Sequence, residues 1–92
     1  PGRLVNMIEI FYSPKFKRSY KKLPPEIKNK VKERILIFKS DPFNSKLKTH
    51  KLHGLLSKFW SFYIDFGYRV IFKFESEKVV ELHEVGSHDI YE

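Results

Sequence analysis

The side chains in this sequence that could do chemistry are mainly imidazole, guanidinium and phenol groups, because the chain has no cysteine. Its four histidines are His50, His53, His83 and His88. None of them has the spacing or acidic neighbours of a known metal motif, although His50 and His53 could share an ion. Motifs for serine nucleophiles, nucleoside triphosphates and dinucleotides are also missing. We therefore expect chemistry without a metal or a cofactor.

Imidazole, arginine and tyrosine side chains on a basic chain suit the cleavage of RNA by its own 2′-hydroxyl group. The ribose oxygen attacks the neighbouring phosphorus, so a base must take its proton and an acid must protonate the 5′-oxygen that leaves. Two imidazoles that titrate near neutral pH can supply both steps. An arginine fork can hold the extra charge on the phosphoryl oxygens, and aromatic rings can stack on unpaired bases.

The positive charge is concentrated in one part of the chain. The net charge is +7, but residues 15–51 hold 13 Lys and Arg against three acidic residues, a net +10. Residues 52–92 carry a net −3. A basic half attracts polyanions such as nucleic acid, although a solvated lysine-rich face would give the same pattern.

The length of 92 residues favours one domain, and 41% hydrophobic residues are enough for a packed core. Residues 1–6 precede the only methionine, Met7, and are interpreted as a cloning remnant or an alternative start, so the domain is expected over residues 7–92. No apolar run approaches the roughly 20 residues that cross a bilayer. We expect a cytoplasmic protein without a signal peptide.

Apolar spacing predicts a strand over residues 8–12 and then two helices. Ser13 and Pro14 are typical of a helix start, and Phe16, Tyr20 and Leu23 would form its apolar face. A second helix would begin at Pro24-Pro25 and end before Pro42. Its apolar stripe consists of Ile27, Val31, Ile35 and Phe38.

Residues 42–58 are predicted to be a polar, basic and flexible connection that contains His50. Three strands follow over residues 59–65, 68–74 and 79–85, and their short turns indicate an antiparallel meander. The predicted fold class is α+β with the order β-α-α-β-β-β and both helices on one sheet face. The other face stays open for a ligand, and strand alternation directs Arg69 onto it, as a ligand contact or a partner of Asp65 or Glu81.

Three segments within this order resemble the RelE/ParE toxin superfamily, and most closely its histidine-bearing YafQ-like mRNA interferases. They are HKLHGLLSKFW at residues 50–60, YRVIFK at residues 68–73 and VGSHDIY at residues 85–91. The similarity extends from about Ile8 to Tyr91. It implies a type II toxin that cuts mRNA in the ribosomal A site, contacts ribosomal RNA and is neutralised by a cognate antitoxin.

The resemblance also implies roles for matched positions. His88 and His50 match histidines of the YafQ-like site and would be the acid and base, in an order that the sequence does not give. Arg69 matches the arginine that stabilises the phosphate in RelE-type members, and Tyr91 matches an aromatic residue that stacks on a base. Tyr63 stands where YafQ-like members carry another histidine, and Gly67 stands where they carry an aspartate.

Further substrate contacts are expected from residues around these positions, namely Lys51, His53, Lys58, Tyr63 and Asp89. His53 could equally be structural because it precedes Gly54, and His83 could pair with Glu81 on the same strand. Two other functions stay open for this fold. One is a ParE-like inhibitor that binds DNA gyrase without catalysis, and the other is an inactive toxin homologue that only binds its antitoxin.

Overall fold

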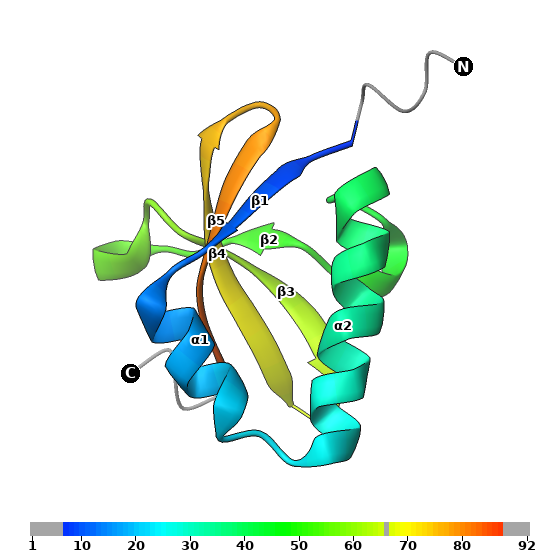
Figure 1. Cartoon of the computed structure of the whole chain (residues 1–92). Helices are drawn as coiled ribbons and strands as arrows, with labels where there is room; N and C mark the ends of the chain where they lie inside the picture. The colour runs from blue at the N-terminus through cyan, green and yellow to red at the C-terminus, as the bar shows by residue number, and fades with distance from the viewer. Residues whose placement is uncertain (1–6, 66, 88–92) are drawn as a thin grey trace.

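Serine and proline residues set the ends of the two helices, which Figure 1 shows in the computed structural model. The structure describes residues 7–65 and 67–87. Ser13 is the N-cap of α1 (Pro14–Lys21), and its hydroxyl oxygen accepts the Phe16 N–H at 3.0 Å. Helix α2 (Pro25–Ser40) starts after Pro24 and ends one residue before Asp41, which is extended because it precedes a proline. Both helices match the predicted bounds closely.

The sheet has five strands in the spatial order β1-β5-β4-β3-β2. They are β1 (Glu9–Tyr12), β2 (His50–Lys51), β3 (Trp60–Asp65), β4 (Tyr68–Ser76) and β5 (Val79–Gly86). The meander of β3, β4 and β5 is confirmed, and β1 adds to it by pairing parallel to β5. The short β2 was not predicted and pairs antiparallel with β3. Figure 1 shows α1 and α2 on the same face of this sheet, as expected.

The core lies between the helices and the sheet and is built around aromatic rings. Phe38 of α2 is fully buried, with its ring centroid 4.8 Å from those of both Phe62 and Phe72. Val31 is also fully buried, two turns earlier on α2. Removing a ring from such a site costs about 3–5 kcal/mol, so this cluster fixes α2 on β3 and β4.

Residues 42–58 are held by specific contacts, which corrects the prediction of a flexible connection. Two short 3-10 helices, η2 (Ser45–Leu47) and η3 (Gly54–Leu56), lie on either side of β2. Leu47 is fully buried and Leu52 nearly so, and the Thr49 hydroxyl donates to the Pro42 carbonyl oxygen. His50 therefore lies on a fixed segment of backbone. Neither helix is long and apolar enough to cross a bilayer, within the part of the chain that is described.

Candidate active site

The sheet face without helices carries three polar side chains close together, which form the candidate site. Tyr63 lies across from Arg69 in the β3–β4 pairing, and Arg69 lies across from Gly86 of β5. His50 pairs with Ser61, and Lys48, two residues earlier, has its Nζ over the Tyr63 ring. Residues that oppose each other across strands project to the same face. We call Lys48 and Arg69, together with the Tyr63 ring that both cations approach, the cation row.

Arg69 has a donor group with no partner among the described residues. Its guanidinium carbon is 5.3 Å from the centre of the Tyr63 ring, and its Nη1 atom is buried without a hydrogen-bond partner in the described residues. Asp65 and Glu81, the carboxylates suggested as partners, lie 3.9 and 3.8 Å from lysine ammonium groups instead. A buried donor without an acceptor costs about 1–3 kcal/mol, which an oxygen of a bound anion would recover.

Lys48 supplies the second cation, and the sequence analysis did not single it out. Its Nζ is 4.9 Å from the centre of the Tyr63 ring. Its backbone is left-handed, with φ of 49°. Strand alternation could not have placed it, because Lys48 precedes β2 and is the left-handed cap residue of η2. Two cations therefore approach the same tyrosine ring on this sheet face.

His50 is oriented by the backbone of Lys48. The imidazole Nδ1 is 3.0 Å from the Lys48 carbonyl oxygen. Because a carbonyl only accepts, Nδ1 must carry a hydrogen, and Nε2 of the neutral ring is left with a free lone pair. The side chain is solvent-exposed, so Nε2 can accept a proton from a ligand. A hydrogen bond from Nδ1 to this carbonyl thus directs Nε2 of the neutral ring away from the backbone as the acceptor.

Three of the expected substrate contacts do not join the cation row. Lys51 lies across from Trp60, so alternation turns it away from the face that His50 occupies. His53 and Lys58 flank η3, the loop that projects from the sheet in Figure 1. Within the described ranges, no hydrogen bond, ion pair or ring contact links these side chains to the row. In the same ranges, no three His, Asp or Glu side chains are grouped closely enough to hold a metal ion.

His88, Asp89 and Tyr91 lie outside the described residues, so their roles stay predictions. The structure describes β5 up to its last residue, Gly86, which lies directly across from Arg69. The chain therefore leaves β5 beside the cation row. Phe66, expected in the turn with Gly67, is likewise outside the described residues, whereas Gly67 has the positive φ of 84° that such a turn needs.

His83 belongs to the packing of the sheet. Its ring centroid is 4.7 Å from that of Phe59. Burial lowers the pKa of the His83 imidazole, and the charge of Lys15 adds to this effect. The suggested pairing with Glu81 is not what the structure shows, because the Glu81 carboxylate lies by a lysine ammonium group. A neutral, stacked imidazole is a structural group.

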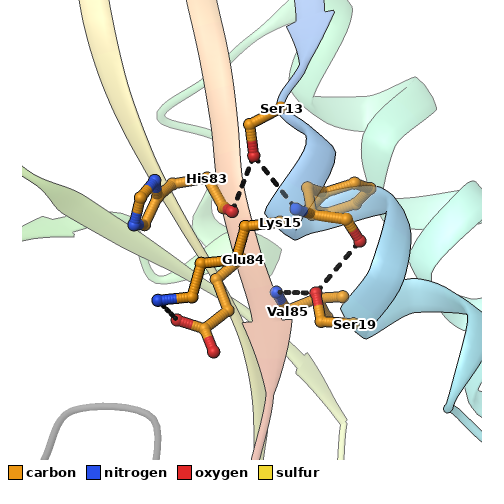
Figure 2. Close-up of polar contacts among 7 residues, drawn as sticks. Ser13, Lys15, Ser19, His83, Glu84 and Val85 are labelled. Atoms are coloured by element: carbon orange, nitrogen blue, oxygen red, sulfur yellow. Dashed lines mark hydrogen bonds and ion pairs between the residues drawn. The ribbon is translucent and has the colours of Figure 1, made fainter.

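Side chains of α1 and of its N-cap residue contact the end of β5, as Figure 2 shows. The β4–β5 register shifts at His83, which leaves part of its backbone outside the ladder. The Ser13 hydroxyl donates to the His83 carbonyl oxygen at 2.9 Å. The Ser19 hydroxyl oxygen accepts the Val85 N–H at 3.1 Å, and the hydroxyl donates to the Phe16 carbonyl. We call these contacts the α1–β5 junction, which fixes where Gly86 meets Arg69.

A basic hollow of about 380 Å³ lies between α1 and the end of β5. Its cationic lining residues are Lys15, Arg18 and Lys22, and Gly86 forms part of its wall. Lys15 is 3.3 Å from the Glu84 carboxylate, the acidic residue of the hollow. Because Gly86 also adjoins Arg69, basic groups lie on both sides of the β5 end.

Comparisons with known proteins identify the fold. No protein-family model matches the chain, and no curated protein sequence matches it significantly. Solved structures do match. YafQ from Escherichia coli strain BL21(DE3) superposes with a TM-score of 0.73 at 22% identity, over 91% of this chain and 97% of YafQ.

Two further structures show the same likeness. A chain of the toxin–antitoxin complex RelBE2 from Mycobacterium tuberculosis has a TM-score of 0.74 at 20% identity, covering 88% of this chain and 98% of its own. The YoeB/ParE toxin from Agrobacterium tumefaciens has a TM-score of 0.73 at 19% identity, covering 88% and 99%. The resemblance to the RelE/ParE toxins is thus confirmed as a shared fold over nearly the whole chain.

Proposed function

We propose that this protein is the toxin of a type II toxin–antitoxin system and cleaves mRNA on the ribosome. The fold supports the toxin role, because YafQ, RelBE2 and YoeB/ParE share it. Two observations on the sheet face without helices carry the catalytic part: Arg69 has a buried Nη1 without a hydrogen-bond partner among the described residues, and His50 has its Nδ1 3.0 Å from a carbonyl oxygen, which leaves Nε2 of the neutral ring as an acceptor. A phosphodiester and its 2′-hydroxyl group fit this pair of groups.

Each group has a role in the reaction. Nε2 of His50 accepts the proton of the 2′-hydroxyl as its oxygen bonds to phosphorus. Arg69 donates to the phosphoryl oxygens, whose charge grows as the fifth bond forms. The bond from phosphorus to the 5′-oxygen then breaks, and we assign the proton for that oxygen to His88. The products are a 2′,3′-cyclic phosphate and a 5′-hydroxyl end, with Tyr91 stacked on a neighbouring base.

The test is a cleavage assay on translating ribosomes with a defined mRNA. Wild-type protein should cut in the A-site codon and leave the two ends named above. Arg69→Ala, His50→Gln and His88→Gln should each lose activity and growth arrest. Lys28→Asn is the matched control, because Lys28 also lies over a tyrosine ring, 5.8 Å from the centre of Tyr20, but on a helix.

Unchanged cleavage and toxicity in the His88 variant would remove the acid assignment. If purified protein leaves mRNA intact but blocks supercoiling by DNA gyrase, the ParE-like alternative replaces this proposal. Protein that harms no cell, even without any antitoxin, would instead indicate an inactive homologue.

The proposed partner is an acidic antitoxin, and the helix side of the molecule offers a groove for it. A hollow of about 500 Å³ lies between β1, α1 and α2. Its apolar residues are Tyr12, Phe16, Tyr20 and Ile35, and its cationic residues are Lys17, Lys21 and Lys32. Phe16 is only 3% exposed, so the floor suits aliphatic side chains better than stacked bases. An amphipathic helix with acidic flanks has the complementary chemistry.

A further inference from the structure

We propose that Lys48 is a phosphate-binding and positioning residue of this site. In this proposal its ammonium group is the second cation for a bound phosphodiester, and its carbonyl group keeps His50 in the tautomer of a base. The ligand class rests on the proposed function. The two contacts of Lys48, with the Tyr63 ring and with the His50 imidazole, do not depend on that function.

The backbone of Lys48 is unusual. Of the non-glycine residues in 7–65 and 67–87, it is the one with positive φ. Glycine and asparagine adopt this conformation at lower cost than lysine, and it is the usual place for them at the end of a helical turn. Both neighbouring residues have specific contacts: Leu47 before it is buried, and the Thr49 hydroxyl after it donates to the Pro42 carbonyl oxygen.

This one conformation has two consequences at the site. It points the Lys48 carbonyl oxygen at Nδ1 of His50, 3.0 Å away, and it brings the ammonium group 4.9 Å from the Tyr63 ring centre. Arg69 approaches the same ring at 5.3 Å. No carboxylate forms an ion pair with Lys48 or Arg69 among the described residues. Two cations without a counter-ion repel each other, and an anion bound at both would relieve that repulsion.

A lysine selected only for the fold would not be expected at such a position, because asparagine meets the backbone requirement better. A strained residue that also contacts a candidate site is a reason to suspect function. The proposal therefore separates two properties of Lys48. Its side chain should serve ligand binding, and its backbone should serve His50.

The experiment compares Lys48→Asn, Lys48→Arg and Lys48→Val with Lys28→Asn as the control. Binding is measured by fluorescence anisotropy with a single-stranded 2′-O-methyl oligoribonucleotide, which cannot be cleaved. Stability is measured by urea unfolding, and the His50 tautomer by ¹⁵N NMR of the ring. Cleavage on ribosomes is measured in parallel.

Lys48→Asn should keep or raise the urea midpoint of unfolding, and His50 should keep its Nδ1–H tautomer. RNA binding should weaken about tenfold. The slope of the logarithm of the binding constant against the logarithm of the salt concentration should fall in magnitude by about 0.7, which corresponds to one lost phosphate contact. Lys48→Arg should bind like the wild type. Lys48→Val resists positive φ, so it should lose the fixed tautomer and shift the pH profile of cleavage. If Lys48→Asn does not fold, Lys48→Gly makes the same comparison.

Unchanged RNA binding in Lys48→Asn overturns the side-chain role, and a tautomer that survives in a folded Lys48→Val overturns the backbone role. A loss of stability in both Lys48→Asn and Lys48→Gly would mean that lysine serves the fold, which also overturns the proposal. Failure of the proposed function looks different. Wild-type protein would then leave mRNA intact, while the binding and NMR comparisons would still decide the role of Lys48.

Discussion

At the level of single residues, we expect Arg69 to favour activity while it lowers the stability of the free protein. Its Nη1 is buried without an acceptor in the described residues, so it costs stability in the free protein and gains a partner when an anion binds. Arg69→Met should therefore leave the free energy of unfolding unchanged or higher. The same change should lower kcat/KM for mRNA cleavage by roughly 10²–10³-fold, the usual effect of losing a donor to a charged transition state.

Urea unfolding and steady-state cleavage measure the two quantities for Arg69. Arg69→Lys is the informative companion, because it keeps the charge without the planar fork, and we expect it to lose at least tenfold in activity. A variant that is as unstable as it is inactive would show that Arg69 is a structural residue.

His83 makes stability depend on pH. Burial beside Phe59 lowers the pKa of this imidazole in the folded chain below its unfolded value, so the unfolded state takes up a proton first as the pH falls. Stability contributed by His83 is complete above that unfolded pKa and declines below it. We expect the wild-type urea midpoint to fall between about pH 7.5 and pH 5.5. His83→Gln should flatten this decline, and an equal decline in both proteins would contradict the assignment.

The sequence predicted part of this site and missed the part that depends on one turn. Arg69 lies on the open face because strand alternation requires it, and that could be worked out from residues 68–74. The contact of His50 with Lys48 could not be predicted from the sequence, because it depends on a left-handed residue between the buried Leu47 and β2. Left-handed backbone at a lysine has no signal in composition or periodicity.

At the level of elements, the α1–β5 junction should carry stability that local helix preference does not explain. Ser19→Ala leaves the Val85 N–H without its acceptor, and this should cost about 1–3 kcal/mol. Ser40→Ala is the control, because its hydroxyl also donates to a carbonyl three residues earlier, at 3.1 Å, but on an exposed helix end. It should change the free energy of unfolding by no more than about 0.5 kcal/mol.

Urea or thermal unfolding of the two serine variants would decide this. Equal, small effects would mean that water replaces the Ser19 hydroxyl at Val85 and that the junction does not fix β5. If the larger effect is found, the Ser19 variant should also lose some cleavage, because β5 ends at Gly86 across from Arg69.

Elements with strong local signals were predicted, and elements defined by distant pairing were not. The helix starts at Pro14 and Pro25 follow from proline and cap preferences, so their positions could be read from neighbouring residues. The parallel pairing of β1 with β5 joins segments about 70 residues apart, and β2 has two residues. Neither a distant partner nor a two-residue strand leaves a periodic pattern.

At the level of the whole molecule, the site proposed for RNA and the groove proposed for the antitoxin lie on different surfaces. The cation row and His50 lie on the sheet face without helices, whereas the apolar groove with its lysines lies on the helix side. An antitoxin helix in that groove would contact this protein without overlapping the cation row. Binding of RNA and binding of antitoxin should therefore respond to different substitutions.

Lys21→Glu combined with Lys32→Glu tests this separation, because both residues are exposed and belong to the groove. Cleavage on ribosomes should stay within about threefold of wild type, since neither lysine is near the cation row. Binding of the antitoxin should weaken by roughly ten- to a hundredfold, because like charges would then face its acidic flanks. The partner for the assay is the small acidic protein that we expect to be co-translated with this chain, and growth rescue and anisotropy are the readouts. Full neutralisation of the double variant would place the antitoxin elsewhere, and a parallel loss of cleavage would show that the two surfaces are not independent.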